Sequence, residues 1–192
     1  ELGVTEAGCM AHARRKFHEL WANHGSQVGE QALKFFIQLY EIEREVRDLP
    51  AEERRVIRQD KTKPIADALH QWLTQQRQKV LDGSATAKAI DYSLKRWPAL
   101  VRYIDDGELP IDNNWVENQI RPIAIGRNNW LFAGSLRAGK RAAAVMSLVH
   151  SARLNGHEPY AYLRDVLERL PTQPDSRITE LLPHRWLPKP AA

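Results

Sequence analysis

The chain has 192 residues and a mass of 22.1 kDa, which suits one domain or two small ones and excludes a short peptide. With 43% hydrophobic residues, 27% charged residues, 11 Pro and 10 Gly, it has the composition of a folded globular protein and not of a disordered or fibrous one. The sequence has neither an apolar run long enough to span a membrane nor the zones of a signal peptide, and its single cysteine, Cys9, cannot form an internal disulfide. We therefore expect a cytoplasmic protein.

The first half of the sequence has the periodicity of amphipathic helices. Apolar residues recur every three or four positions in segments that begin near Ala11, Gln27, Ile65 and Thr86. A charged stretch from 51 to 59 is also predicted to be helical, and Pro64 separates it from the next helix. Pro98 interrupts the last segment, either as a kink or as the first turn of a new helix. Residues 27 to 105 therefore predict a helical block with little in it that demands chemistry.

The character of the sequence changes at the turn 105–107. Asp112 is predicted to cap a short helix that runs through Glu117 and ends at Pro122. The remaining predicted elements are two short apolar runs that are strands or turns (123–126 and 129–133), an Ala-rich helix (141–154), a helix opened by Pro159, and an anchored, extended tail from Pro171.

Basic charge is concentrated between residues 118 and 157. This stretch holds 6 of the 28 Lys and Arg residues and none of the 24 Asp and Glu residues. Guanidinium groups, amides and aromatics in one segment suit a phosphate backbone and unpaired bases, whereas the alternative is a solvated basic face. The residues that we expect to contact nucleic acid are Arg121, Arg127, Asn128, Trp130, Arg137, Lys140 and Arg141. Arg44, Arg47 and Arg54, in the helical block, are expected to contribute much less.

Two further motifs carry weaker signals. Residues 134–141 have the G-x-x-x-x-G-K spacing of a phosphate-binding loop, but Arg141 replaces the hydroxyl that such a loop needs for Mg²⁺. A basic turn that touches nucleic-acid phosphate is therefore favoured over nucleotide hydrolysis. Cys9-x-x-His12 has the spacing of two metal ligands, yet no second pair follows it, so a buried cysteine beside a polar histidine is the preferred interpretation.

Glu117 has two interpretations. Placed four residues before Arg121 on a helix, it is ordinarily one half of a weak surface salt bridge. A lone carboxylate at the rim of a phosphate-binding surface is also where a Mg²⁺ ligand for phosphoryl transfer belongs.

Several separated blocks of the sequence resemble the insertion-sequence-66 family of bacterial DDE transposases. IDNNWVENQIRP (111–122) and GRNNWLFAGS (126–135) resemble the family signature, and GCMAHARRKF (8–17) resembles the segment just after its second catalytic aspartate. Residues 151–163 and 181–186 resemble the family's C-terminal element. The resemblance covers the chain from Gly8 to Pro188, with the blocks in the order of the family.

This resemblance implies a ribonuclease-H-like α/β core in which two aspartates on strands and one glutamate on a helix hold Mg²⁺ for DNA strand cleavage and strand transfer. Glu117 matches that glutamate, and residues from about 24 to 105 match the helical insertion before it. Both aspartates would lie upstream of Gly8, outside this sequence. The aspartates shortly before Glu117 do not replace them, because they lie on the wrong side of the insertion.

We accordingly predict a mainly helical chain, formed by the insertion and the C-terminal helices of a core whose strands lie upstream. The expected segments are the end of the first part of the core (1–23), the helical insertion (24–106), the catalytic-glutamate helix with the basic segment (107–150), and the C-terminal element (151–192).

The implied function is that of the C-terminal part of a DNA transposase, with Glu117 as catalytic residue and metal ligand. Mg²⁺ is the cofactor of the complete enzyme, and this chain is expected not to bind it tightly and to be inactive alone. The expected partners are DNA at transposon ends and targets, and further copies of the protein or accessory transposition proteins, with no membrane. The alternative is a non-catalytic DNA-binding or regulatory remnant of a transposase.

Overall fold

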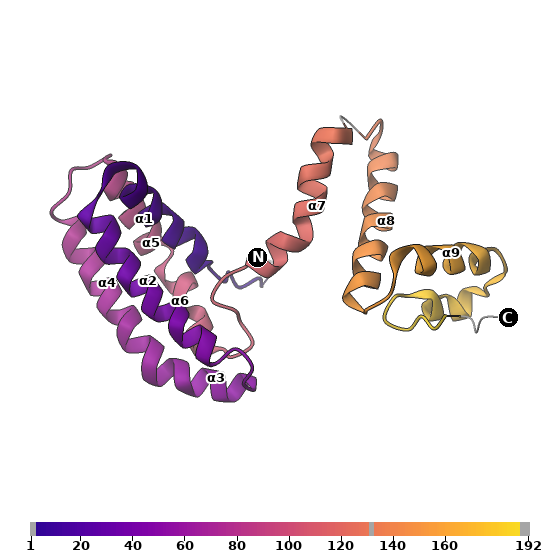
Figure 1. Ribbon diagram of the computed structural model, residues 1–192, viewed down its shortest axis with the longest axis horizontal. Helices are drawn as coiled ribbons and strands as arrows, with labels where there is room; N and C mark the ends of the chain where they lie inside the picture. The colour runs from indigo at the N-terminus through magenta and orange to yellow at the C-terminus, as the bar shows by residue number, and fades with distance from the viewer. Residues whose placement is uncertain (1–2, 131–132, 189–192) are drawn as a thin grey trace. The chain divides into compact units, whose positions relative to one another are not determined.

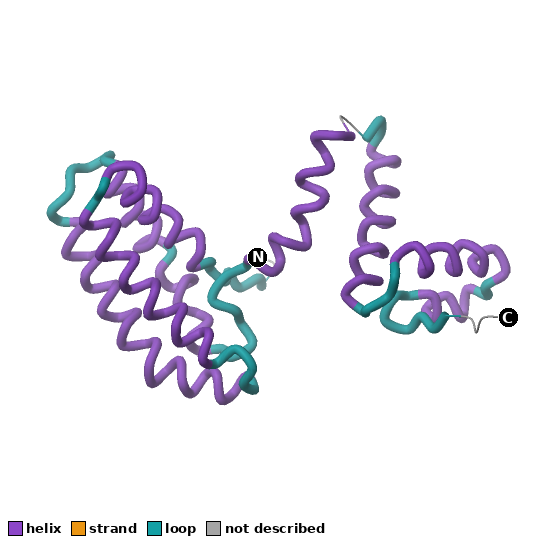
Figure 2. The backbone as a smooth tube through the Cα atoms, viewed as in Figure 1, coloured by secondary structure: helices purple, strands orange, loops and turns teal. Residues whose placement is uncertain are grey.

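The structure is a computed structural model that describes residues 3–130 and 133–188, without the side chains of Asn128 and Trp130. It divides into two compact units, an N-terminal unit (Glu1–Glu117) and a C-terminal unit (Asn118–Ala192). Each unit is described by itself. The described residues form helices and loops and contain no strand (Figure 2), which confirms the prediction of a mainly helical chain.

The helices follow one another with short connections (Figure 1). In chain order they are α1 (Met10–His24), α2 (Gln27–Glu45), α3 (Ala51–Ile57), the π-helical turn η1 (Arg58–Thr62), α4 (Lys63–Arg77), α5 (Ala85–Lys95), α6 (Trp97–Asp105), α7 (Asn114–Trp130), α8 (Leu136–Leu154), α9 (Pro159–Arg169), and the 3₁₀ turns η2 (Leu170–Thr172) and η3 (Asp175–Leu181). Within the described ranges, none of these helices is long and apolar enough to cross a membrane.

The N-terminal unit is a helical bundle in which α1 and α4 each pack against both α2 and α5 (Figure 1). The predicted apolar stripes form its core, with Phe17, Phe36, Leu69 and Ile90 almost completely buried. The rings of Phe17 and Phe36 lie 5.8 Å apart between centroids. Because full burial of such a side chain contributes about 1.5–3 kcal/mol, these stripes supply most of the driving force for the bundle.

Two prolines of the bundle are placed differently from each other. Pro98 lies in the first turn of α6, so it begins a new helix and does not kink an existing one. Pro64 does not separate two helices, because α3, η1 and α4 follow one another without a break. A proline inside a helix lacks an N–H and clashes with the carbonyl four residues earlier. The π-helical turn relieves this clash by widening the backbone, and the N–H of Lys63 bonds the carbonyl of Arg58.

The expectation that Pro122 ends a short helix is wrong. Pro122 lies inside α7, which continues to Trp130. The residues predicted as strands or turns are helical from 123 to 126 and at 129–130, while Leu131 and Phe132 lie outside the described residues. The prediction failed because an interior proline removes only one backbone hydrogen bond, and because short apolar runs have no period that distinguishes a strand from a helix.

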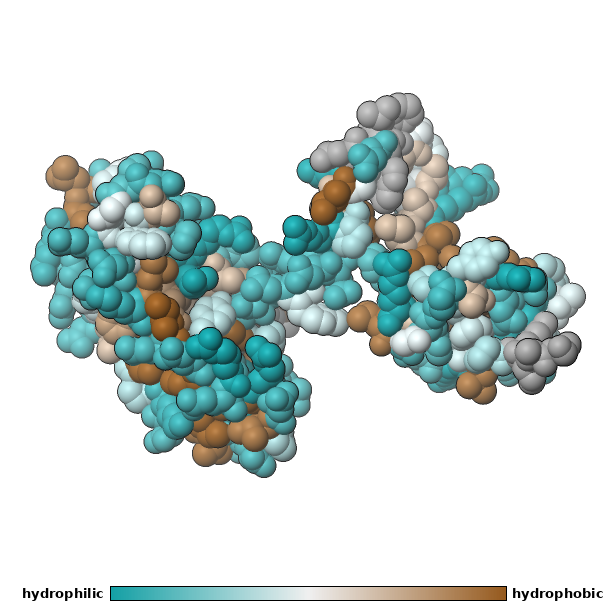
Figure 3. Space-filling model, in the orientation of Figure 1, coloured by the Kyte–Doolittle hydropathy of each residue, from teal (hydrophilic) through white to brown (hydrophobic). Residues whose placement is uncertain are grey.

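Along α7 the apolar residues stay uncovered. No described side chain of this helix is buried, and hydrophobic atoms lie on its surface in Figure 3. The exposed apolar residues of α7 are Trp115, Val116, Ile120, Ile123 and Ile125. Trp115, Val116, Ile120 and Ile123 share one side of the helix, and this apolar face lacks the covering layer that a globular domain normally provides.

A small core of its own holds the C-terminal unit together. It is formed by Ala152, Tyr162, Val166, Leu181 and Trp186. The Tyr162 hydroxyl donates to the carbonyl of Leu181 at 2.8 Å, and the Trp186 indole donates to Asp165 at 2.6 Å. The tail is therefore anchored, but the extended conformation predicted for it is wrong over η2 and η3. Its isolated apolar residues gave no periodicity that would have indicated these short turns.

Candidate active site

The chain enters and leaves the helical bundle at one place. The N–H of Gly8 donates to the carbonyl of Ala99 at 2.8 Å, and the N–H of Met10 donates to the carbonyl of Ile111 at 3.1 Å. A Cβ atom on Gly8 would lie only 2.8 Å from the backbone nitrogen of Leu100, so this approach requires glycine. The start of α1 and the segment before α7 are thereby held side by side.

Asp112 fixes the start of α7 to the bundle. One carboxylate oxygen accepts from the N–H of Asn114 at 3.1 Å, and the other accepts from the hydroxyl of Tyr40 at 2.9 Å. The N-cap predicted at Asp112 is displaced by one residue, because α7 begins at Asn114 and the N–H of Glu117 donates to the carbonyl of Asn113. Asp112 instead bonds the N–H of the first residue of the helix. Burial, followed by the hydrogen bond to Asp112, raises the pKa of Tyr40 well above its usual range, so the phenol remains a donor.

Glu117, in the first turn of α7, lies beside His12 of α1. The distance from Glu117 Oε1 to His12 Nε2 is 3.4 Å, and the two side chains are 43% and 35% exposed. Glu117 therefore pairs with His12 and not with Arg121. A contact this exposed contributes little to stability, so its importance lies in bringing together two blocks of sequence that flank the helical bundle.

The described side chains around Glu117 do not by themselves make up a metal site. Mg²⁺ takes oxygen ligands, and two-metal phosphoryl transfer requires several carboxylates. Within the described part of the chain, no group of three His, Cys, Asp or Glu side chains is gathered to hold a metal ion. Cys9 is a buried free thiol, and His12 faces Glu117. Among the described residues, Cys9 and His12 are therefore not joined by further ligands that would complete a metal site.

The predicted DNA contacts that the structure describes are all exposed. Arg121 and Arg127 lie on α7, and Arg137, Lys140 and Arg141 lie in the first turns of α8. Over the ranges that the structure describes, none of these five takes part in an ion pair. The side chains of the other two predicted contacts, Asn128 and Trp130, lie outside the described residues.

The first turn of α8 is capped by the preceding residue, Ser135. Ser135 Oγ accepts from the N–H of Ala138 at 3.1 Å, and Gly134 has a φ of 78°, which favours glycine. Residues 136–141 are helical, so they do not form the loop of a nucleotide-binding site. The three cationic residues of this turn line a hollow of about 560 Å³ together with Leu136 and Ala144. Cations at the positive end of a helix suit an anionic ligand.

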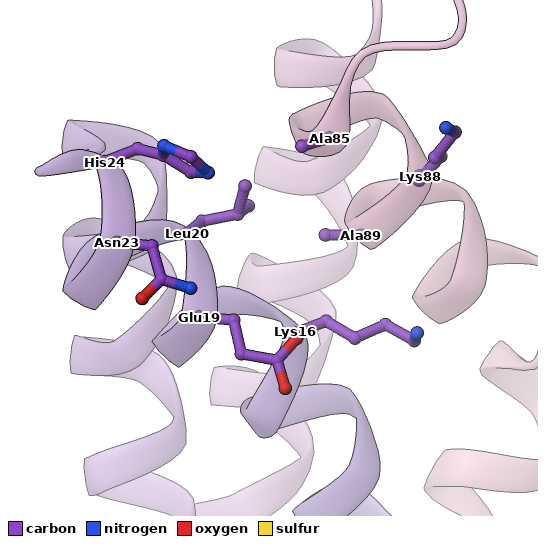
Figure 4. A pocket seen from close by; sticks show the side chains of 8 residues that line it. All are labelled: Lys16, Glu19, Leu20, Asn23, His24, Ala85, Lys88 and Ala89. Atoms are coloured by element: carbon purple, nitrogen blue, oxygen red, sulfur yellow. The ribbon is translucent and has the colours of Figure 1, made fainter.

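A hollow between α1 and α5 contains none of the predicted site residues. Its volume is about 260 Å³. Figure 4 shows Ala85 and Ala89 of α5 pointing toward α1, while Lys88 points away. Lys16 and Glu19, of opposite charge, lie at the rim, and Lys16 Nζ is 4.6 Å from the centre of the Tyr92 ring. Because none of the predicted site residues lines it, this hollow is not a candidate for the catalytic site.

The sequence analysis missed Arg58, which positions the segment leading to α7. Arg58 is 1% exposed. It binds both carboxylate oxygens of Glu43 at 2.7 and 2.8 Å. Its Nη1 group donates to the carbonyls of Tyr103, Asp106 and Leu109 at 2.8 to 3.1 Å. The sequence did contain a signal for its burial. Arg58 and Thr62 continue the buried stripe of α4 toward the N-terminus at helical spacing.

Comparison with known proteins identifies the class of this chain as a transposase. Residues 1–141 match the family described as "Transposase IS66 family", and residues 147–184 match "IS66 C-terminal element". The chain therefore belongs to the IS66 transposase family.

Similar proteins from Sinorhizobium fredii include "Uncharacterized protein y4hP", which is 42% identical over 95% of this chain and 35% of its own length. "Uncharacterized protein y4jD" is 37% identical over 94% of the chain and 36% of its own length. The chain thus spans about a third of the length of the relatives it matches. No solved structure shows a significant match to it.

Proposed function

We propose that this chain is the C-terminal part of a DNA transposase that performs metal-dependent strand cleavage and strand transfer, with Glu117 as a catalytic residue and metal ligand. The observation that carries the proposal is the contact between His12 and Glu117. It joins the block resembling the segment after the second catalytic aspartate to the block resembling the catalytic-glutamate signature. Membership of the IS66 family supports both assignments.

The uncovered apolar face of α7 supports a ribonuclease-H-like core that is completed outside this chain. Helices of an α/β domain bury their apolar face against a sheet, and the described residues contain no strand. The missing sheet and the two aspartates would come from other parts of the whole protein. The four segments expected from the sequence keep their proposed roles in that protein.

Glu117 would then act as one of several carboxylates around the reacting phosphate. When bound there, Mg²⁺ neutralises phosphate charge and activates the attacking hydroxyl or water. The exposed cations of α7 and α8 would hold the DNA backbone, with Asn128 and Trp130 contacting bases. Self-association, or accessory transposition proteins, would bring two transposon ends together.

The test substitutes Glu117→Gln in the whole transposase. We expect strand cleavage to fall by at least about 100-fold, because a metal ligand is lost, while DNA binding and folding stay nearly unchanged. Glu30→Gln is the matched control, since Glu30 is also partly exposed and pairs with Lys34 at 3.2 Å. Cleavage near the wild-type rate in Glu117→Gln would reduce Glu117 to a structural partner of His12 and contradict its assignment as a catalytic residue. Absence of cleavage by the whole wild-type protein would favour the alternative of a non-catalytic remnant.

The isolated chain provides a second test. With one carboxylate at the site, the purified chain should not nick DNA in Mg²⁺ or Mn²⁺. Nicking that depends on Glu117 would contradict the proposal that the remaining ligands lie outside the chain.

A further inference from the structure

Two adjoining hollows on the N-terminal unit gather arginines from separate segments of the bundle. The hollows measure about 370 and 270 Å³ and share Tyr40, Arg44 and Arg47. Arg14 of α1 lines the first hollow, and Arg54 of α3 lines the second. We call the surface formed by Arg14, Arg44, Arg47 and Arg54 the arginine groove.

The acidic residues in this groove are already engaged. Arg58 binds both oxygens of Glu43 and balances its charge. Asp112 accepts from Tyr40 and from the N–H of Asn114. The groove therefore keeps an excess of positive charge, although the surrounding helical bundle has charges of both signs.

The guanidinium groups of the groove are largely available to a ligand. Arg44 has a loose ion pair with Glu41, at 3.6 Å, between two exposed side chains. Within the described residues, Arg14, Arg47 and Arg54 form no ion pair, and the Nε atom of Arg54 is buried without a hydrogen-bond partner. Leaving buried donors unpaired costs free energy, and guanidinium groups match phosphate oxygens in geometry and charge.

The groove ends at the segment that carries the proposed catalytic residue. Its second hollow is lined by Ile111 and Asp112, and Glu117 follows shortly after them in the first turn of α7. A polyanion lying along the groove would thus lead to the start of α7.

We propose that the arginine groove binds the phosphate backbone of DNA. This inference rests on the proposed function, because it takes DNA as the substrate. It gives the helical insertion a role in DNA binding, where the sequence indicated only packing. It also reverses the expectation that Arg44, Arg47 and Arg54 contribute little to DNA affinity.

The experiment measures binding of the full chain to a short DNA duplex by fluorescence anisotropy at several salt concentrations. The groove variant is Arg14→Ala/Arg44→Ala/Arg47→Ala, which leaves the partly buried Arg54 in place. The control variant is Lys79→Ala/Lys88→Ala/Lys95→Ala, which removes the same charge from exposed positions of the same unit. A third variant replaces Arg14, Arg44 and Arg47 with Lys and keeps the charge. Circular dichroism verifies that each variant is folded.

We expect the groove variant to flatten the log–log salt dependence by up to about 2.7, at roughly 0.9 for each phosphate no longer contacted. The wild type would then lose up to about 40-fold more affinity than the groove variant between about 50 and 200 mM salt. The control variant should stay close to the wild type, and the Lys variant should retain most of the slope.

Equal slopes and affinities for the groove and control variants would overturn the proposal, as would a wild-type chain that does not bind DNA. A groove variant that binds DNA normally but loses affinity for poly-glutamate would overturn it in favour of an acidic protein partner. These binding measurements are independent of the cleavage assay of Glu117→Gln. The proposal for the arginine groove and the proposed function can therefore be refuted separately.

Discussion

Arg58→Met should destabilise the N-terminal unit more than any surface substitution. The substitution leaves the Glu43 carboxylate, 12% exposed, without its cationic partner. It also removes the donor that serves three backbone carbonyls. Breaking a buried ion pair by removing one partner typically costs about 3–5 kcal/mol. This is a large share of the roughly 5–15 kcal/mol that stabilises an ordinary domain.

The loss is measured by thermal unfolding together with hydrogen exchange of amides in α4 and α5, because the chain has two compact units that can unfold separately. At about 4–8 °C per kcal/mol for a domain of this size, the midpoint should fall by roughly 12–40 °C. Arg55→Met is the matched control. Arg55 is an exposed neighbour that pairs with Glu52 on the same helix, and its loss should change the midpoint little.

The double variant Arg58→Met/Glu43→Met distinguishes two causes of the lost stability, the unpaired charge of Glu43 and the lost packing of Arg58. Replacing both members of a buried pair by apolar residues is often close to neutral, so the double variant should regain much of the stability, although the carbonyls stay unpaired. A midpoint for Arg58→Met within about 5 °C of the wild type, with unchanged exchange protection, would refute the role assigned to Arg58.

Two further predictions concern close backbone contacts at glycines and the titration of buried tyrosines. Gly107→Ala should cost about 1–3 kcal/mol or more, because a Cβ there would lie 1.7 Å from the carbonyl oxygen of Ala51. Gly139→Ala should be stabilising, because Gly139 lies inside α8 and a Cβ there makes only an ordinary van der Waals contact. Urea unfolding measures the change in unfolding free energy of each variant. Burial raises the pKa values of Tyr40 and Tyr103. Their contribution to stability is therefore present below the unfolded value of about 10 and is lost as the pH rises above it. Ultraviolet titration should show at least two tyrosines that ionise only on unfolding, and early ionisation of all tyrosines would contradict this.

The bundle was predictable from the sequence because its contacts are periodic. Residues such as Phe36 and Leu69 repeat at helical spacing and are buried where the stripe requires. Arg58 lies on the same stripe as Leu69 but was not predicted to be buried, because a stripe defined by hydropathy excludes charged residues. Its burial is made favourable by carbonyls 45 to 51 positions further along the chain, and no local pattern contains them.

The candidate site was predictable only in part. The signature around Glu117 led to that residue, yet its contact with His12 depends on how the bundle returns the chain to its starting point. The arginine groove was missed for the same reason, since Arg14, Arg47 and Arg54 come from separate helices and turns. For α7, the sequence predicted a break at Pro122 because a proline was treated as a terminator, whereas the helix continues past it.

The adjacent entry and exit of the helical bundle have a consequence for how this protein can change during evolution. Because Gly8 bonds Ala99 and Met10 bonds Ile111, the bundle is attached like a domain inserted into a loop. Helices within it can lengthen or shorten without displacing the residues on either side of the attachment. Homologues should therefore vary in length mainly at turns such as Leu81–Gly83, between α4 and α5, where Leu81 is 84% exposed. The same turn is a suitable place for a fluorescent or affinity tag.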